Sequence, residues 1–470
     1  MSSLAMEFDF DISNDLVMVF EISRHGARNG KGMDPFQTQW DQGELTNVGR
    51  RQHYIMGQQI RQRYVNQAKI LSPYYSPSQI YIKTTNDNET IESAYSQLMG
   101  LYPLGSNKYH LQPNTSQEAT PQFNVSNDIQ QKSMVDLQDK ALPYDFMPFK
   151  ILATQPLNDA FMMTKQCEFV RTEMENIKSS QEIFNNLDSK YSTTLYSLAE
   201  SIFRDPSNFR SSEAVKFIDS LYARYYDKQE MYGQFTPELV HDMMVMYYDY
   251  MNQTITKNPT VLKALLTQTF NKIIQKFTKQ IEKENGKKIS KADQHKFFMY
   301  IDHDDVLMHF SNLYNHMLFH PEEVRYVPYA SVILLELHRL SDGKYYVNAS
   351  INGQPVAQPG PCNDQYFCEI HLFEDLARQY SYYDDSNGYE KVCGLTPESK
   401  YQIKMSAWNQ SYQYAAGILR KKVNPYMRIL ELYAVLMLII ILAWIIYANL
   451  RGRDHHQNPF HPQEQNVEMT

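Results

Sequence analysis

The sequence predicts an α/β protein, a three-layer sandwich with a mostly parallel central sheet and helices on both faces. Short, nearly continuous apolar runs occur at residues 16–22, 79–83 and 296–301, as expected of strands that are buried on both faces. Amphipathic helical patterns follow the first two runs, at residues 49–65 and 90–101. This order of strand, helix, strand and helix is typical of a parallel sheet.

A long interruption separates the second helix from the third apolar run. Residues 105–160 are rich in Ser, Asn, Gln and Pro, which predicts extended loops. Two helices are expected after them, at residues 237–251 with Thr236 as N-cap, and at residues 260–284 with Gly286 as C-cap.

The sheet is expected to resume after this interruption. Residues 331–338 and 344–347 predict two neighbouring antiparallel strands. We therefore predict a discontinuous α/β core that encloses a helical insert, or cap domain. The predicted parts are a core of residues 16–103 and 292–400, an insert of residues 104–291, a juxtamembrane segment at 401–431, a membrane span at 432–450 and a polar tail at 451–470.

The span is predicted from the segment LYAVLMLIIILAWIIYANL at residues 432–450, which carries no charged residue. Its length matches the roughly 20 residues that a helix needs to cross a bilayer. The alternative is a buried core helix, but few soluble helices are apolar on every face for five turns. We expect a single-pass protein that contacts the lipid bilayer through this segment. Basic residues lie on both sides of it, so the positive-inside rule does not decide the orientation.

Cysteines and glycosylation sequons favour a lumenal or extracellular location for the large N-terminal domain, in a lysosome or vacuole or at the cell surface. The four cysteines and six sequons all precede the predicted span: Cys167, Cys362, Cys368 and Cys393, and Asn88, Asn114, Asn124, Asn252, Asn348 and Asn409. Residues 1–15 contain neither a basic nor an apolar signal region. Either the true start of the protein lies upstream, which we favour, or the membrane anchor alone targets the protein. The formal net charge of -8 excludes the basic footprint of a nucleic-acid-binding protein.

The first candidate site follows the first apolar run, where Arg24 and Arg28 flank His25 and Gly26. Ligands of open α/β sheets bind at the carboxyl ends of the strands. Arginine suits phosphate oxygens, glycine lets the backbone approach closely, and a neutral histidine can attack phosphorus. A solvated basic turn is the simpler interpretation of such a triplet taken alone.

A second polar cluster, His303 and Asp304, follows the run at residues 296–301. At the same sheet edge, Asp304 could protonate a leaving alcohol and His303 could contact phosphate. Such an acid must be partly protonated, which favours an acidic pH optimum unless its pKa is raised. The alternative is a metal site formed by residues 302–305, but an oxygen-rich run of this length is not specific and no further ligands are evident.

Several ordered blocks resemble the histidine acid phosphatase family of the prostatic and lysosomal type, within the phosphoglycerate-mutase-like superfamily. They span roughly residues 16–395, and the insert diverges. The blocks are RHGAR at 24–28, GELTNVGRRQHYIMGQQIRQRY at 43–64, IYIKTTNDNETIESAYSQLMGLYP at 80–103, FFMYIDHDDVL at 297–307 and PYASVILLELH at 328–338.

This resemblance implies an acid phosphatase that cleaves phosphomonoesters through a phosphohistidine at His25. Asp304 would donate the proton, and the phosphate would be held by Arg24, Arg28, Lys83 and His303. The resemblance also implies two disulfides, Cys362 with Cys368 and Cys167 with Cys393. We expect no metal and no other cofactor.

Three positions depart from the family pattern. Lys83 stands for a phosphate-binding arginine and loses its bidentate geometry. Glu89 stands for another arginine and reverses a charge near the site, and Gly30 replaces a proline. Weakening one phosphate contact by ~1.5–3 kcal/mol would lower the rate about ten- to a hundredfold.

Three functions therefore remain under consideration. The first is an active membrane-anchored acid phosphatase. The second is a weakened or inactive relative that binds phosphorylated ligands. The third is a phosphotransferring mutase, which the anchor and cysteines disfavour. The sequence does not specify the substrate or the oligomeric state, for which a homodimer is one option.

Overall fold

The computed structural model describes residues 15–36, 41–112, 118–121, 123, 125–154, 167–229, 231, 233–256, 258–314, 326–395 and 437. The chain forms two compact units, Met1–Thr396 and Pro397–Thr470, and every helix and strand named below belongs to the first. The predicted juxtamembrane segment, span and tail lie outside the described residues, apart from Met437. No helix in the described part of the chain is long and apolar enough to cross a membrane.

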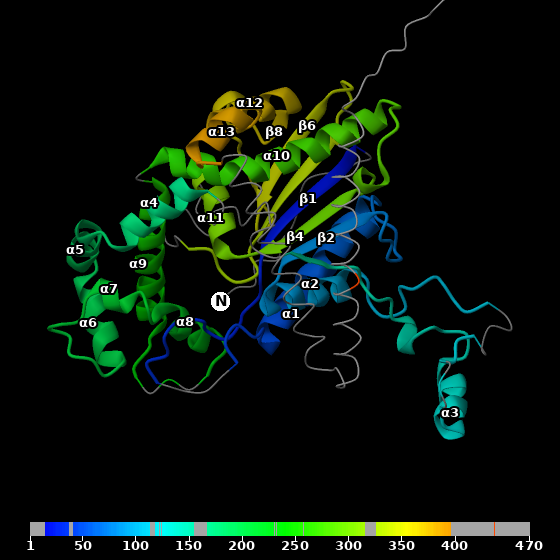
Figure 1. Cartoon of the computed structure of the whole chain (residues 1–470), viewed down its shortest axis with the longest axis horizontal. Coiled ribbons are helices and arrows are strands. Elements are labelled where there is room, and N and C mark those ends of the chain that lie inside the picture. Colours follow the sequence, from blue (N-terminus) through cyan, green and yellow to red (C-terminus); the bar gives the residue numbers. More distant parts are fainter. Residues whose placement is uncertain are drawn as a thin grey trace, which may run out of the picture. The chain divides into compact units, whose positions relative to one another are not determined.

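The strands form one mixed sheet in the order β3-β2-β4-β1-β5-β6-β7, with β8 paired to β6 (Figure 1). The strands are β1 Leu16–Arg24, β2 Ile80–Thr85, β3 Leu152–Thr154, β4 Phe297–Asp302, β5 Val332–Arg339, β6 Tyr345–Ile351, β7 Gln354–Val356 and β8 Phe367–Glu369. Pairs among β1, β2, β3 and β4 are parallel, whereas β5 to β8 add antiparallel pairs. The prediction of a mostly parallel sheet was therefore wrong. The antiparallel pair β5–β6 was predicted, but β5 also pairs antiparallel with β1, and the short strands β7 and β8 add two further antiparallel pairs to β6.

Helices flank this sheet on both sides (Figure 1). The α-helices are α1 Asn47–Ile60, α2 Asn88–Leu101, α3 Asn127–Leu137, α4 Glu168–Lys178, α5 Gln181–Lys190, α6 Ser192–Ser201, α7 Ser211–Ala214, α8 Ile218–Tyr226, α9 Pro237–Thr256, α10 Pro259–Glu284, α11 Asp304–Leu313, α12 Ile370–Tyr380 and α13 Ser386–Val392. A π-helix, η1 Arg61–Gln67, continues α1. Short 3₁₀ turns are η2 Pro143–Asp145, η5 Lys291–Asp293 and η6 Gly360–Cys362.

The two faces of β1 enter two different cores. Phe20 and Ile22 join the larger cluster, which includes side chains of α9, α10 and α11, whereas Val19 joins a second cluster with α1 and α2. Both clusters bury side chains that alternate along the strand, as a sheet between two helical layers requires. The predicted three-layer arrangement is thus seen in the packing. The predicted boundary between core and insert stays a prediction.

The predicted loop at residues 105–160 is only partly correct. It contains α3 and the short edge strand β3, although none of the side chains of α3 is buried. The helix lacks a stripe of apolar residues, so its sequence offers no periodic signal. The caps of the later helices follow the prediction: Leu239 donates to Thr236 Oγ1 at 3.2 Å, and Gly286 has a φ of 82° after α10.

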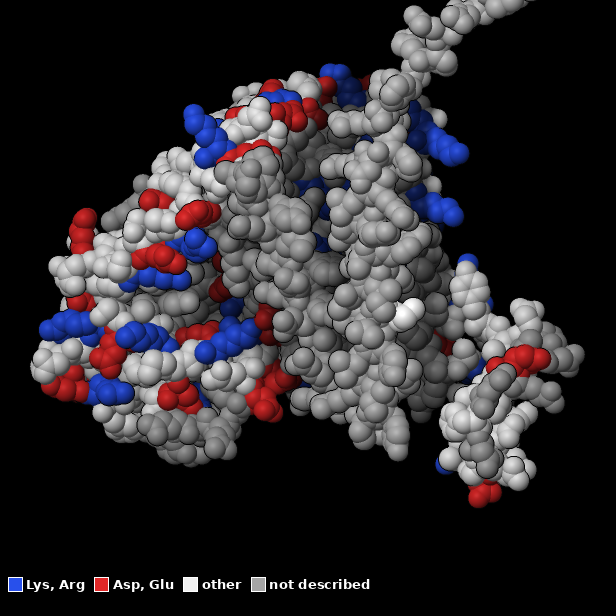
Figure 2. All heavy atoms as spheres, in the orientation of Figure 1, with Lys and Arg blue, Asp and Glu red and all other residues white. Residues whose placement is uncertain are grey.

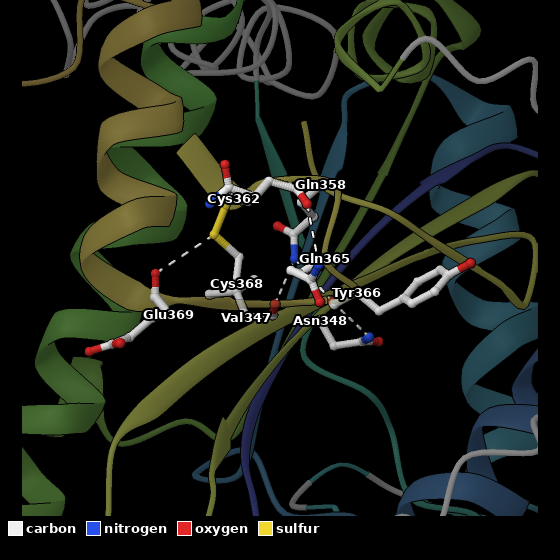
Figure 3. The surroundings of a disulfide bond; sticks show 9 residues. Val347, Asn348, Gln358, Cys362, Gln365, Tyr366, Cys368 and Glu369 are labelled. Carbon is white, nitrogen blue, oxygen red and sulfur yellow. Dashed lines mark hydrogen bonds between the residues drawn. A yellow bond between two sulfur atoms is a disulfide. The ribbon is translucent and has the colours of Figure 1, made fainter. Parts of the chain in front are cut away.

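Two disulfides join the pairs that the resemblance implies, Cys167 with Cys393 and Cys362 with Cys368. Figure 3 shows the second, beside the strands β6 and β8. Near it, the side-chain nitrogen of Asn348 donates to the Tyr366 carbonyl at 3.1 Å, and this asparagine is only 6% exposed. Asn348 is therefore not an accessible glycosylation acceptor in the folded protein, although its sequence motif is intact.

Charged side chains of both signs intermix on the outer surface of α5, α6, α7 and α8 (Figure 2). Interspersed charges of this kind favour solubility and produce no strong local field.

Candidate active site

The loop after β1 and the segment after β4 meet at one edge of the sheet. The two strands are adjacent and parallel, and Arg24 pairs in register with Asp302. His25 follows the first strand and His303 the second, so both lie at the carboxyl edge, where α/β folds bind ligands. The two imidazole rings are 5.2 Å apart between centroids, in an edge-to-face arrangement. This confirms the predicted meeting of the two polar clusters.

His25 is buried and held in one tautomer. Its Nδ1 lies 2.8 Å from the carbonyl oxygen of Gly26, which can only accept, so Nδ1 carries the proton and Nε2 keeps its lone pair. Burial lowers the pKa of His25 well below its usual range, and Arg28, Arg24 and His303 lower it further. The imidazole is consequently neutral, with a free lone pair, even under mildly acidic conditions.

The loop is positioned by a close crossing with the start of α1. A Cβ atom built on Gly26 would lie 2.5 Å from the Gly49 carbonyl oxygen, and one built on Gly49 would lie 2.1 Å from the Ala27 carbonyl oxygen. Only glycines fit at this crossing. The Gly26 amide also donates to Ser93 Oγ of α2 at 3.0 Å, so both helices on this face fix the loop.

Arg24 joins the loop to the predicted proton donor. Its Nη2 lies 3.2 Å from Asp304 Oδ2, and Tyr248 of α9 donates to the same carboxylate at 2.5 Å. Arg24 also contacts the Val327 carbonyl and lies over the ring of Tyr329, 4.5 Å from its centroid. Burial opposes ionisation of Asp304, but Arg24 and Tyr248 outweigh it and lower the pKa of that carboxyl.

Arg28 also forms ion pairs with carboxylates. Asp219 of α8 accepts two hydrogen bonds from its guanidinium, at 3.1 and 3.0 Å, and Glu89 Oε1 lies 3.7 Å from its Nε. Glu89 is 1% exposed and forms a 2.5 Å ion pair with Lys31 Nζ. The charge reversal noted in the sequence is thus directed into the site, where the carboxylate of Glu89 offsets the positive charges of Arg28 and Lys31.

His303 is the charged histidine of the pair. Its Nε2 lies 3.1 Å from Asp87 Oδ2 and 3.3 Å from Thr85 Oγ1. Burial alone would lower its pKa, but the hydrogen bond to Asp87 and the charges of Asp302, Asp305 and Glu89 raise the pKa of His303 to about 9. The cationic imidazolium of His303 therefore faces the neutral imidazole of His25.

Within the described residues, one group has the spacing of a metal site, though not the one considered from the sequence. The ligand atoms of His25, Glu89 and His303 lie within 4.8 Å of one another. Glu89 is already paired with Lys31, and His303 with Asp87. A divalent cation here would also be repelled by the positive charges of Arg24, Arg28 and Lys31. Of the acidic run, Asp302 and Asp305 accept backbone amides, at 2.9 and 2.8 Å.

Lys83 is on β2, which β4 separates from β1, and its Nζ lies 5.9 Å from the ring centroid of Tyr300. Its phosphate-binding role stays a prediction.

Several residues of the site were not predicted. Asp219 lies on α8 and Tyr248 on α9, and neither forms part of a motif, so no local sequence signal identifies them. Asp87 could have been identified, because it lies in the block that contains Lys83 and Glu89 and directly follows the second predicted strand.

The fold and site together define an α/β protein with a buried, neutral histidine between two arginines at the carboxyl edge of its sheet. The chain belongs to the histidine phosphatase superfamily (branch 2), whose family model matches residues 15–352.

Two curated relatives share short segments with this chain. Human prostatic acid phosphatase is 36% identical over 100 residues, which are 20% of this chain and 25% of that protein. Lysosomal acid phosphatase of Rattus norvegicus is 34% identical over 119 residues, 24% of this chain and 27% of that protein. The chain thus matches about a quarter of the length of each.

Solved structures show the likeness of the fold. The phytase from Citrobacter braakii aligns with a TM-score of 0.55 and 15% identity, covering 81% of this chain and all (100%) of that one. At this identity the match concerns the fold alone.

Proposed function

We propose that this protein is an acid phosphatase that hydrolyses phosphomonoesters through a phosphohistidine on His25. The observation that carries the proposal is the meeting of His25, Arg24 and Arg28 with His303 and Asp304 at one sheet edge. Family membership favours the same chemistry.

In the first step, the Nε2 lone pair of His25 attacks phosphorus while the bond to the ester oxygen breaks. The leaving oxygen takes a proton from Asp304 and departs as an alcohol. Arg24, Arg28 and His303 stabilise the equatorial oxygens of the transferring group. In the second step, water attacks the phosphohistidine, Asp304 accepts a proton from it, and phosphate leaves.

Two unsatisfied arginine donors support the binding of an anion in the candidate site. Among the described residues, the Nε atoms of Arg24 and Arg28 are buried and have no hydrogen-bond acceptor. A buried donor without an acceptor costs ~1–3 kcal/mol, and a phosphate oxygen would remove that cost.

The proposal is tested with an aryl phosphate and the full-length protein in detergent. Acid quenching during turnover should trap a phosphoryl group on the chain, and His25→Ala should abolish both the trapped group and turnover. His371→Ala, at an exposed position of α12, is the matched control and should retain both. Turnover that survives His25→Ala would overturn the mechanism.

A second function is favoured by the carboxylates. Arg24, Arg28 and Lys31 each have an acidic partner, which lowers the net attraction for a phosphate dianion. A protein that binds phosphorylated ligands without turning them over would have this property. Inorganic phosphate bound by folded protein that lacks turnover would support this second function.

We further propose that residues 432–450 anchor the protein and that its large domain is lumenal or extracellular. The apolar, uncharged sequence supports the anchor, and the two disulfides support an oxidising compartment. The protein should resist alkaline extraction from membranes, and removal of residues 432–470 should release it. Extraction of the full-length protein under these conditions would contradict the anchor.

A further inference from the structure

A buried chain of hydrogen bonds runs beneath the catalytic loop, on the face of the sheet covered by α1 and α2. Glu21 lies in the middle of β1 and is 0% exposed. Gln97 Nε2 of α2 donates to Glu21 Oε1 at 2.6 Å, and Gln97 Oε1 lies 3.0 Å from Nδ1 of His53 in α1. The last hydrogen bond of this series joins His53 Nε2 to the carbonyl oxygen of Arg24, the residue before His25, at 3.0 Å.

The end of this chain determines where the protons must be. A carbonyl oxygen only accepts hydrogen bonds, so His53 Nε2 must carry a proton to bind Arg24. If Gln97 Oε1 faces His53, then Nδ1 must carry a proton as well, and His53 is a cation beside an ionised Glu21. If the Gln97 amide is turned over, protonated Glu21 donates to Oε1, Nε2 donates to Nδ1, and every group is neutral.

Both arrangements contain the same titratable proton, on His53 in the first and on Glu21 in the second. The second arrangement, in which every group is neutral, is favoured. Burial raises the pKa of Glu21 to about 7, and burial lowers the pKa of His53 to about 4. The proton therefore stays on Glu21 at acidic pH. Glu21 and His53 therefore titrate as one coupled pair, not as two independent groups.

Loss of this proton breaks the bond to Arg24. Ionised Glu21 can only accept, so the Gln97 side-chain nitrogen must face it, as in the bond to Glu21 Oε1, and Gln97 Oε1 then accepts from Nδ1 of His53. The lone pair of His53 Nε2 is left facing the lone pairs of the Arg24 carbonyl oxygen, which repel it. A hydrogen bond at the base of the catalytic loop thus becomes a repulsive contact.

Among the described residues, no cation is found to act on Glu21. Its neighbours in register are Met299 of β4 and Leu334 of β5. Ser23 is the other polar side chain acting on it, besides Gln97. Two residues along the neighbouring strand, Glu336 is held by Arg63 of η1 in a bidentate pair at 2.8 and 2.7 Å, so that cation is already engaged.

We propose that Glu21, Gln97 and His53 form a one-proton switch that holds the Arg24–His25 peptide in place at acidic pH and releases it when the proton is lost. All three are positioning residues, because His53 acts through the carbonyl oxygen of Arg24, and Glu21 and Gln97 act through His53. The proposal rests on the proposed phosphatase function for its effect on turnover, but the switch can be observed without it.

The first experiment reads the tautomer of His53 directly. Full-length protein in detergent, labelled with ¹⁵N-histidine, is titrated from about pH 5 to about pH 9, and His53→Gln assigns the resonance. We expect Nε2 to be protonated and Nδ1 unprotonated at the acidic end. The two should exchange roles with a midpoint near neutrality. Glu21→Gln can donate to Gln97 but has no proton to lose in this range, so it should abolish the change.

The second experiment reads turnover of an aryl phosphate over the same range. Relative to its own rate at about pH 5, Glu21→Gln should retain roughly tenfold more activity at about pH 8.5 than the native protein. Glu336→Gln is the matched control, a buried carboxylate on the next strand whose pKa is lowered to about 2 by His338 and Arg63 against the effect of burial. It should leave the shape of the profile unchanged.

The outcomes separate the two proposals. A His53 spectrum that is constant with pH, or that changes equally in Glu21→Gln, overturns the switch even in an active enzyme. A profile that Glu21→Gln does not alter overturns its effect on turnover. Native protein without turnover, but with the exchange of tautomers, refutes the phosphatase function and leaves the switch standing.

Discussion

Arg24 Nη2 lies 3.2 Å from Asp304 Oδ2, so the residue before the proposed nucleophile is ion-paired to the proposed acid. This pair lowers the pKa of Asp304, although a proton donor needs the opposite shift. Binding of a phosphate monoester would oppose this effect, because its negative charge competes for Arg24 and repels the carboxylate. If Asp304 is the proton donor, it should therefore be protonated on substrate binding, and more readily under acidic conditions.

The role of Asp304 can be tested through the leaving group. Asp304→Asn keeps the shape but cannot donate a proton, so hydrolysis of an alkyl phosphate should fall about 10²–10⁴-fold. A nitrophenyl phosphate needs little protonation and should lose far less. Steady-state rates for both substrates give the ratio. Asp305→Asn, at the next position, is the control, and an equal loss on both substrates would contradict the assignment.

The charge of His303 gives a prediction on pH. Its pKa of about 9 lies above the ordinary value, so the cation and its contribution to phosphate binding are present below about pH 6.5 and are lost as the pH rises through 9. Asp87→Asn removes the main stabilising hydrogen bond and should move the loss to lower pH. Inorganic phosphate affinity, measured by calorimetry across this range, checks the shift. Identical pH curves for the two proteins would show that Asp87 does not set it.

Much of this site was predictable because its chemistry lies at strand ends. His25 and His303 follow apolar runs that can only be buried strands, and adjacent parallel strands bring their ends together. The charge balance was not predictable, because it depends on long-range partners. Asp219 reaches Arg28 across 191 positions, and Tyr248 reaches Asp304 across 56.

The fold shows the same division. Strands with continuous apolar runs were found to within one or two residues, whereas α3 carries no apolar stripe and was predicted as loop. The proportion of antiparallel pairs was missed because each strand was assigned from its own pattern. Pairing partners are determined by connections and packing that no single segment contains.

Glu89 should limit the affinity for phosphate. It is buried beside Arg28 and Lys31, and removing its charge with Glu89→Gln should make binding more favourable by ~1–2 kcal/mol, at the effective dielectric of such sites. The KM of an aryl phosphate should fall by roughly tenfold. Glu92→Gln, on the same helix but paired with exposed Arg50, is the control. A rise in KM for Glu89→Gln would instead show that the carboxylate orders Arg28 productively.

The two disulfides should contribute unequally to stability. Cys167–Cys393 closes a loop of 226 residues and Cys362–Cys368 one of 6. Chain entropy then predicts a loss of about 5 kcal/mol for the double serine variant of the first and about 2 kcal/mol for the second. Urea unfolding under oxidising conditions measures both. A larger loss from the short loop would mean that local packing beside β8, rather than chain entropy, dominates.

Gly49→Ala should damage the site without touching a catalytic group. The added Cβ would lie 2.1 Å from the Ala27 carbonyl oxygen, which is backbone and cannot rotate away, so the loop must move away from α1. We expect a loss of ~1–3 kcal/mol in unfolding free energy. Because the displaced loop carries Arg28 and His25, kcat should fall even where the protein is fully folded. Val48→Ala, at the preceding and more exposed helix position, should change neither quantity much, and an unchanged kcat for Gly49→Ala would show that this crossing does not position the nucleophile.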